Sequence, residues 1–455
     1  MHFNKNGLED FSRYYGIHYD ICQSDVIVRD FISDAERGLA GKTSFMPMIP
    51  AYIKSSTGVP AGKKALALDA GGTNLRAAIV SFDEDGKVCT EGLTKTFMPG
   101  TRGRLGVDEF YNALAAVCEP LLAGGAAVDG IGFCFSYAME ITKDGDGIPQ
   151  TFSKELDAPD AAGKPVGANL RMALAKRGIQ APERIILLND TTATLLSGAA
   201  QIPAMRPSKI AVDGGQAAGC TAVAAGPAAG LILGTGFNIA YPEKNIPKIG
   251  VHSEDGHIVV TEAGNFLFRY QGLIDKEFDA QTKSPGAYTA EKAISGAYLG
   301  SLNLLVFKKA VEEGLLSFAK AGELCALPRL ETRDLNAFLH NPLSQDGFGA
   351  YFGTGELAAR AAVCYLAGLV TERAALLASA LCAATVVKMG APDNPLAPVR
   401  IAVEGTTYMM YHFMRESFEA RLRTSLAACG IQNYIIMPVE QASLTGAAAA
   451  ALSAA

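Results

Sequence analysis

The clearest chemical signal lies at residues 66–80, where two apolar runs flank a short polar turn that contains two glycines. The turn consists of Gly71, Gly72, Thr73 and Asn74. This pattern predicts a strand, a tight turn and a second strand, with the glycines at positive φ. A glycine turn leaves backbone N–H groups uncovered, so the pattern also predicts an anion site of the kind that holds phosphate.

Asp69 ends the first of these apolar runs, where its carboxylate would lie beside the bound anion. A carboxylate repels a phosphate unless a cation lies between them, so this placement also indicates Mg²⁺. The alternative is an ordinary hairpin in which Asp69 caps the turn. Residues 66–80 alone leave both interpretations open.

A second glycine turn follows the same logic at residues 231–241, where Gly234, Thr235 and Gly236 separate two apolar runs. Asp213-Gly214-Gly215 competes for this role. It lies within residues 201–230, a stretch rich in Ala, Gly and Pro, and is interpreted as a plain surface turn. Two sheets that each direct a glycine turn at a shared cleft would hold a nucleotide from both sides.

Hydrophobic periodicity predicts the elements that position these turns. After the first hairpin we expect a strand, a helix, a buried strand, a helix, another buried strand and a further helix. These are residues 88–97, 107–122, 128–135, 166–177, 184–188 and 193–200. Long helical stretches are expected near 288–312 and 356–389, a strand at 400–403, and an Ala-rich helix at the end. The pattern indicates a mixed sheet with helices on its faces.

Composition limits the class of protein. A chain of 455 residues exceeds what one core usually supports, so two domains are expected. With 49% hydrophobic residues, 19% charged residues and a net charge of −6, the balance argues against nucleic acid as a partner. The nine cysteines are dispersed without a Cys-x-x-Cys pair, which predicts reduced thiols and a cytoplasmic location. No signal peptide is expected, and Pro227 interrupts the apolar stretch 217–233, so no membrane partner is expected either.

Four segments, in order along the chain, resemble the hexokinase family of sugar kinases, within the superfold of actin and the heat-shock chaperones. They are 67–76 and 233–238, similar to the two phosphate loops of the family, 132–137, similar to its sugar-binding strand end, and 188–194, similar to its catalytic segment. Weaker similarities lie at 261–264, 284–292, 404–408 and 446–448. The resemblance covers residue 46 to the C-terminus.

The resemblance implies a two-domain α/β protein with the actin-like ATPase (ribonuclease H-like) fold, mixed sheets and a cleft between the domains. The expected small domain is 57–189, completed by the C-terminal helix 440–455. The expected large domain combines 1–56 with 190–439.

The resemblance also implies a function and its residues. It implies a cytoplasmic, glycolytic hexokinase that transfers the γ-phosphate of ATP to the 6-hydroxyl of a hexose such as glucose. Asp190 is the expected general base, and its alternative role is a helix N-cap. The expected sugar-binding residues are Ser136, Ser153, Lys154, Asn189, Asp190, Asn238, Glu262 and Glu291. The expected ATP-binding residues are Asp69, Gly71, Gly72, Thr73, Asn74, Gly234, Thr235, Gly236, Gly405 and Thr406. Mg²⁺ would be held mainly by phosphate oxygens and water, with Asp69 reaching it through water.

The sequence departs from the family pattern at the rim of the site. Ala138 stands where proline is usual, Ala263 and Asn265 replace the usual Trp and Ala, and Glu404 replaces an aspartate. These changes put the hexose and the nucleotide preference in question. Two other classes therefore stay open: a sugar-binding regulator with weak or no kinase activity, and a chaperone- or actin-like ATPase. Oligomeric state is also left open.

Overall fold

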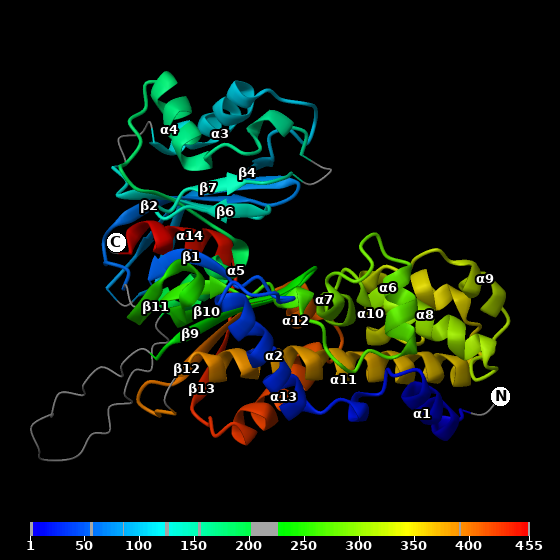
Figure 1. The fold of residues 1–455 in the computed structure, drawn as a ribbon. Helices are drawn as coiled ribbons and strands as arrows, with labels where there is room; N and C mark the ends of the chain where they lie inside the picture. Colours follow the sequence, from blue (N-terminus) through cyan, green and yellow to red (C-terminus); the bar gives the residue numbers. More distant parts are fainter. Residues whose placement is uncertain are drawn as a thin grey trace, which may run out of the picture.

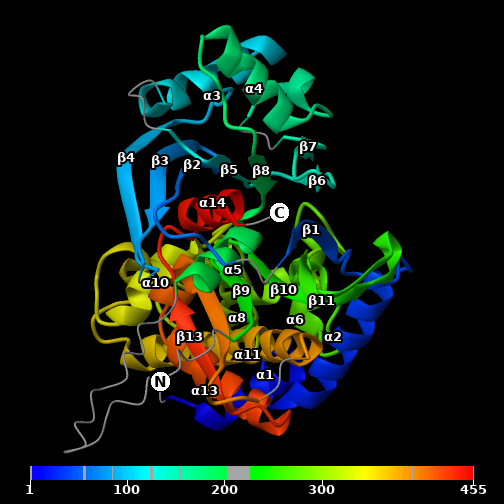
Figure 2. The same ribbon diagram turned by 90° about the vertical axis from the view of Figure 1, so that its left-hand side faces the viewer.

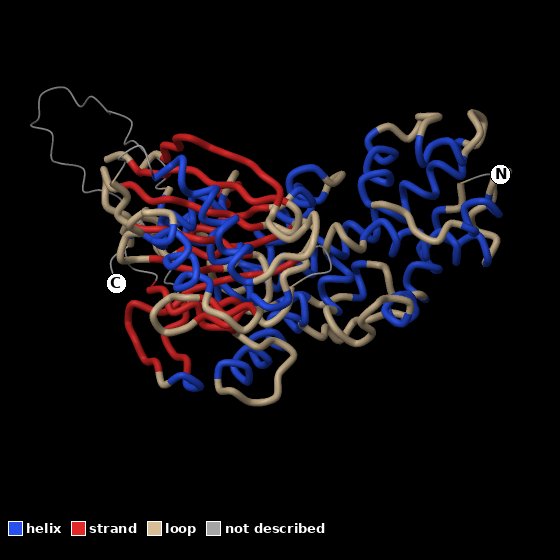
Figure 3. Tube along the Cα trace, turned by 90° about the horizontal axis from the view of Figure 1, so that it is seen from above, coloured by secondary structure: helices blue, strands red, loops and turns tan. Residues whose placement is uncertain are grey.

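The computed structural model describes seven stretches of the chain. They are residues 3–54, 58–84, 86–122, 127–152, 156–201, 226–390 and 393–453. Within them, two β-sheets lie one above the other with helices on their outer faces (Figure 1). Seen from above, the strands gather on one side, and a region made of helices extends to the other (Figure 3).

The first sheet has five strands in the order β4-β3-β2-β5-β8. Its strands are β2 (Lys64–Ala70), β3 (Asn74–Phe82), β4 (Val88–Phe97), β5 (Gly130–Phe135) and β8 (Ile185–Leu188). β3 is antiparallel to both β2 and β4, whereas β2, β5 and β8 run parallel. Helices α3 (Val107–Leu122) and α4 (Val166–Lys176) cover its outer face, and a small hairpin of β6 (Met139–Ile141) and β7 (Gly147–Pro149) lies beside it (Figure 1).

The second sheet has six strands in the order β1-β11-β10-β9-β12-β13. They are β1 (Ile49–Lys54), β9 (Ala228–Leu233), β10 (Phe237–Ile246), β11 (Val251–Val260), β12 (Val399–Glu404) and β13 (Tyr434–Pro438). β1 therefore leaves the N-terminal region to pair with β11, more than 190 residues away. This pairing joins the N-terminal segment to the second sheet, while strands within residues 64–188 build the first.

Ten of the described helices pack around this second sheet, and together with it they form the second region, which contains the largest hydrophobic core. They are α1 (Lys5–Tyr14), α2 (Ser24–Leu39), α6 (Leu273–Ala280), α7 (Thr289–Ile294), α8 (Leu299–Glu312), α9 (Ala321–Ala326), α10 (Thr332–His340), α11 (Leu357–Lys388), α12 (Thr406–Met410) and α13 (Met414–Ala428). The helical stretch expected at 288–312 is thus two helices, interrupted at Ser295–Tyr298. Gly296 N donates there to Gly234 O at 2.8 Å, a contact that a continuous helix would not make.

The 32-residue helix α11 is, among the described helices, the one long and apolar enough to cross a membrane. Its most apolar window is 89% buried inside the protein, as expected of a core helix. α11 also carries a buried positive charge, Arg373, which is stabilised by its hydrogen-bond partners. Its guanidinium donates to both carboxylate oxygens of Asp275 at 2.7 Å and to the carbonyl of Gly16 at 2.7 Å.

Two helices lie between the sheets: α5 (Asp190–Ala200) and the C-terminal α14 (Ala442–Leu452) (Figure 2). They approach each other and the first sheet closely because glycines face the contacts. A Cβ on Gly446 would lie 2.0 Å from the carbonyl oxygen of Ala193, and a Cβ on Gly132 would lie 1.8 Å from that of Ala447. The Ala-rich end of the chain is therefore an interior helix, with α5 on one side and β5 on the other.

The sequence-based elements are largely where they were expected, but one reason given for them is wrong. Gly71, Gly234 and Gly236 do not adopt positive φ. Their turns close by ordinary backbone hydrogen bonds, from Gly71 N to Asn74 O and from Gly234 N to Gly236 O, both at 3.0 Å. The interpretation of Asp213-Gly214-Gly215 as a surface turn falls outside the described residues. The domain boundaries stay a prediction.

The packing of α14 on α5 can be tested with two glycines that both lie inside helices. We expect Gly446→Ala to destabilise the protein by on the order of 1–3 kcal/mol, because its Cβ has no room beside Ala193. Gly368→Ala on α11 meets no atom within 4 Å and should instead stabilise the helix by about 0.5–1 kcal/mol. Urea unfolding of both variants measures this, and equal effects in the two would contradict the proposed packing role.

Candidate active site

The predicted site residues come from the ends of strands whose directions bring them together. β2, β5 and β8 are parallel, so their carboxyl ends place Asp69, Ser136 and Asn189 along one edge of the first sheet. β9 and β12 are parallel in the second sheet, with Ile232 opposite Glu404. Their ends place the turn 234–236 next to Glu404 and Gly405. Carboxyl ends of parallel strands are where ligands bind in α/β proteins.

Asp190 is the first residue of α5 and lies at the junction of the two sheets. Its Oδ1 accepts hydrogen bonds from Thr191 N at 2.7 Å and from Thr191 Oγ1 at 3.2 Å. The N-cap role is filled by Asn189, whose Oδ1 accepts from Thr192 N at 2.8 Å. The alternative for Asp190, a helix cap, is therefore wrong.

The environment of Asp190 strengthens its basicity. Burial raises the pKa of Asp190, the nearby charge of Asp69 raises it further, and the hydrogen bonds from Thr191 partly offset both. A carboxylate with a raised pKa accepts a proton more readily than an ordinary one. Asp190 is thus chemically suited to remove a proton from a hydroxyl group.

Three glutamates lie near Asp190: Glu262 just after β11, Glu291 on α7 and Glu404 at the end of β12. Burial raises the pKa of Glu262, Glu291 and Glu404, and in each case the charge of Asp190 raises it further. Each has a hydrogen-bond donor of its own: Asn238 Nδ2 to Glu262 Oε1 at 2.9 Å, Phe237 N to Glu291 Oε2 at 3.0 Å, and Thr194 Oγ1 to Glu404 Oε2 at 3.1 Å. Acceptors held in this way suit the hydroxyl groups of a sugar.

Asn238 and Glu262 form a local unit beside the second glycine turn. Asn238 Oδ1 accepts from Ile239 N at 2.8 Å, which aims its amide group at Glu262. Glu262 adopts a left-handed conformation with φ 57° and ψ 44°. A non-glycine residue there is strained, and such strain persists where the surrounding structure enforces it, often at functional sites.

Asp69 is paired inside the protein. Its Oδ2 accepts from Arg76 Nε at 2.7 Å, and the two residues lie directly opposite each other across the β2–β3 hairpin. A cation of the protein itself therefore neutralises this carboxylate, and the contact of Asp69 with Mg²⁺ through water stays a prediction. Oδ1 of Asp69 remains for water. Among the described residues, no group of three or more His, Cys, Asp or Glu side chains is arranged to hold a metal.

The glycines of the second turn allow backbones to approach each other. A Cβ on Gly234 would lie 3.2 Å from Gly405 Cα, and Gly405, at φ 131°, would bring a Cβ within 2.3 Å of Leu233 O. Thr407 Oγ1 donates to Gly234 O at 2.7 Å, which fixes the start of α12 against this turn. The predicted nucleotide residues Gly234, Thr235, Gly236, Gly405 and Thr406 are thus one cluster. Asp69 to Asn74 form the other, on the first sheet.

Ser136 is exposed at the end of β5, and its N donates to Ala70 O at 3.0 Å, which places it beside the first turn. Ser153 and Lys154 lie outside the described residues. The site also contains three residues to which the sequence interpretation assigned no role: Arg76, Thr194 and Glu404. The first could have been found from the sequence, since Asp69 and Arg76 are equally far from the centre of the turn.

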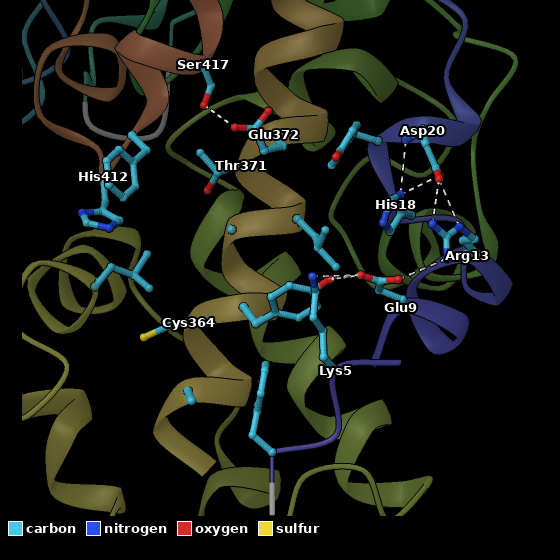
Figure 4. Close-up of a pocket in the computed structure, with 18 residues that line it drawn as sticks. Lys5, Glu9, Arg13, His18, Asp20, Cys364, Thr371, Glu372, His412 and Ser417 are labelled. Carbon is cyan, nitrogen blue, oxygen red and sulfur yellow. Dashed lines mark hydrogen bonds and ion pairs between the residues drawn. The ribbon is translucent and has the colours of Figure 1, made fainter. Parts of the chain in front are cut away.

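A large cavity, about 900 Å³, lies among α1, α11 and the start of α13, and none of its lining residues belongs to the predicted site (Figure 4). One face of α11 forms its floor, and α1 and the α12–α13 junction form walls. Its carboxylates already have partners: Glu9 accepts from Tyr365, Asp20 from Arg13, and Glu372 from Ser417. These carboxylates therefore serve structural contacts between the helices.

Comparisons with known proteins agree with this geometry. Two family models, each described as hexokinase, match residues 16–200 and 228–453. Hexokinase-2 of Candida albicans is 28% identical, over 93% of this chain and 87% of its own length. Hexokinase-2 of Saccharomyces cerevisiae is 27% identical, over 97% of this chain and 90% of its own.

Solved structures give the same fold. The hexokinase from Schistosoma mansoni complexed with glucose has a TM-score of 0.71 at 23% identity and covers 98% of this chain and 99% of its own. Another hexokinase crystal structure reaches 0.74 at 21% identity, with the same coverage. The two sheets, with strand-end loops meeting between them, define the actin-like ATPase fold. The family models together span most of the chain, which belongs to the hexokinase family.

The raised pKa of Asp190 has a consequence for stability. The ordinary pKa of an aspartic acid is 3.8, and that of Asp190 is higher in the folded protein. The protonated form is therefore compatible with the fold below pH 3.8, and stability is lost as the pH rises through the pKa of the folded state. At pH 7 the charged Asp190 therefore destabilises the fold. We expect Asp190→Asn to melt at a higher temperature than the wild type at pH 7, with the gap closing towards pH 4.

Calorimetry across pH 4–8 measures this difference, and the exposed Asp10 provides the control. Asp10→Asn should show no comparable gain at pH 7. A melting temperature of Asp190→Asn that stays at or below the wild-type value at pH 7 would contradict the destabilising role of the charged carboxylate.

Proposed function

We propose that this protein is an ATP-dependent hexokinase that transfers the γ-phosphate of ATP to the 6-hydroxyl of a hexose such as glucose. The observation that carries the proposal is the position of Asp190, a half-buried carboxylate of raised pKa between the two glycine turns. The family, the named relatives and the glucose-bound structural neighbour support the same activity.

The sugar would lie between the two sheets. Asn238, Glu262 and Glu291 offer one hydrogen-bonding set, already oriented by backbone and side-chain bonds. Ser136 and the amide Nδ2 of Asn189 offer the other. Ser153 and Lys154 stay predicted members of the same site. Because an unpaired hydroxyl in a closed site weakens binding, polar groups on both sides select a polyhydroxylated ring.

Asp190 would accept the proton of the attacking hydroxyl as its oxygen forms the bond to phosphorus. Phosphoryl transfer depends mainly on positioning and on stabilising the charge of the phosphoryl oxygens. The first turn, with Gly71, Gly72, Thr73 and Asn74, would hold one part of the triphosphate through backbone N–H groups. Gly234, Thr235 and Gly236 would hold another, with Gly405 and Thr406 on the adenosine side.

Mg²⁺ fits the residues present only as an ion held by phosphate and water, since the described carboxylates form no metal cage. Asp69 Oδ1 would bind one of its waters. Bound in this way, Mg²⁺ supplies neutralisation of phosphate charge. Arg76 contributes independently, because its salt bridge removes the net charge of Asp69 from the path of the triphosphate.

The eight cysteines that the structure describes are free thiols, which suits a reducing compartment such as the cytoplasm. We propose this location together with a role in glycolysis. No nucleic-acid or membrane partner is proposed.

The role of Asp190 in transfer can be measured directly. Loss of a general base slows a reaction by roughly 10²–10⁴-fold, so kcat of Asp190→Asn should fall by that factor. The dissociation constant for glucose should change much less, because the other sugar-binding groups remain. A coupled assay with ATP–Mg²⁺ gives kcat, and calorimetric titration gives glucose affinity. If Asp190→Asn turns over as fast as an active wild type, Asp190 is not the base. If the wild type itself shows little turnover, the sugar-binding regulator is favoured.

Binding of the hexose should also bring the two sheets together. Ser136 and Asn189 come from the first sheet, whereas Asn238, Glu262 and Glu291 come from the second region, so a ligand bonded to both sets binds the closed form better. We expect glucose to decrease the radius of gyration in solution scattering, and sorbitol, which has no ring, to leave it unchanged. The competing ATPase class predicts the reverse: no compaction by glucose, and ATP hydrolysis that is indifferent to it.

A further inference from the structure

The first glycine turn is hydrogen-bonded to the side chain of Tyr137, which lies just after β5. Tyr137 follows Ser136, and its hydroxyl donates towards two carbonyl oxygens, Gly71 O at 3.2 Å and Gly72 O at 3.3 Å. The third carbonyl of the turn, Thr73 O, accepts from Met98 N at 2.9 Å. All three carbonyls are therefore turned towards protein donors.

The orientation of these carbonyls determines the orientation of the amides. In a planar trans peptide, the C=O of one residue and the N–H of the next point in opposite directions. With the carbonyls of Gly71 and Gly72 turned towards Tyr137, the N–H groups of Gly72 and Thr73 are turned away from it. Gly72 and Thr73 are exposed, so these amides face the space that a ligand would occupy. Consecutive N–H groups that point the same way form an anion-binding nest.

Tyr137 itself is rigidly placed. Its side chain is 8% exposed, and its ring packs against Phe135, with centroids 4.9 Å apart, and against Phe152, edge-on at 5.6 Å. Such aromatic pairs restrict the ring, so the hydroxyl has little freedom to leave the turn. A phenylalanine at this position would keep the ring contacts and lose the hydrogen bond to the carbonyls of the turn.

We infer that Tyr137 is a positioning residue for the nucleotide: its hydroxyl presents the backbone amides of the first turn to a phosphate group of ATP. It acts through the backbone and does not itself touch the phosphate. The inference rests on the proposed function and extends it, because it links the strand end that carries Ser136 to the phosphate loop. Ser136, which would contact the hexose, and Tyr137, which fixes the phosphate loop, are then neighbours in the sequence.

The test is Tyr137→Phe with a matched control, Tyr111→Phe. Tyr111 lies in the same core, is 2% exposed, and its buried hydroxyl has no hydrogen-bond partner among the described residues. For Tyr137→Phe we expect the dissociation constant of a non-hydrolysable ATP analogue, measured with glucose present, to rise about three- to tenfold, as expected for a lost neutral hydrogen bond. KM for ATP should rise in parallel, and kcat should change less. Glucose affinity without nucleotide should match the wild type, and Tyr111→Phe should leave all of these values unchanged.

Two outcomes would overturn the inference: analogue affinity within twofold of the wild type, or equal losses of glucose and analogue affinity, which would show a general effect on the fold. Failure of the proposed function is seen separately, as a wild-type protein that releases no ADP in response to any hexose. Analogue binding can be measured even then, so the role of Tyr137 is tested independently of turnover.

Discussion

The close backbone packing of α5 is the constraint on which the site depends. Gly230 allows β9 to approach this helix, since a Cβ there would lie 2.5 Å from Leu195 N, and Gly198 faces Ala402 of β12 in the same way. Gly446 brings α14 against the other side. A helix enclosed by backbone on several sides cannot shift without moving both sheets. Its first residue, Asp190, is thereby held in one place relative to strands from each sheet, as a preorganised site requires.

The packing around α5 brings four carboxylates close together, and their mutual repulsion and burial destabilise the folded state. Asp190, Glu262, Glu291 and Glu404 each have a pKa raised by burial, and their charges act on one another. This arrangement favours the neutral forms and destabilises the folded protein at neutral pH. Donors at each carboxylate, and the salt bridge of Arg76 with Asp69, limit the effect without removing it. Lower stability at an active site is a common consequence of the demands of function.

Much of the architecture could be predicted because it is local. Apolar runs broken by glycine turns gave the β2–β3 and β9–β10 hairpins, and helical spacing gave α3, α4 and α11. The conformation of Gly71 and Gly234 could not be predicted in this way. A glycine is compatible with positive φ, but it also allows close approach, and only the neighbouring backbone shows which property a site uses. At Gly234 the neighbour is Gly405, 171 residues further along the chain.

The sequence by itself determined the residue types of the candidate site, the order of its motifs and the family. It also contained the Asp69–Arg76 pair, because a hairpin turn sets which residues face each other. The tertiary structure decided what pairs across long distances: Glu404 with Thr194, Tyr137 with the carbonyls of Gly71 and Gly72, and α14 with α5. It also decided that Asn189, and not Asp190, caps α5. Such contacts depend on how sheets and helices pack, and burial then sets the charge state of each carboxylate, a property that no residue type carries alone.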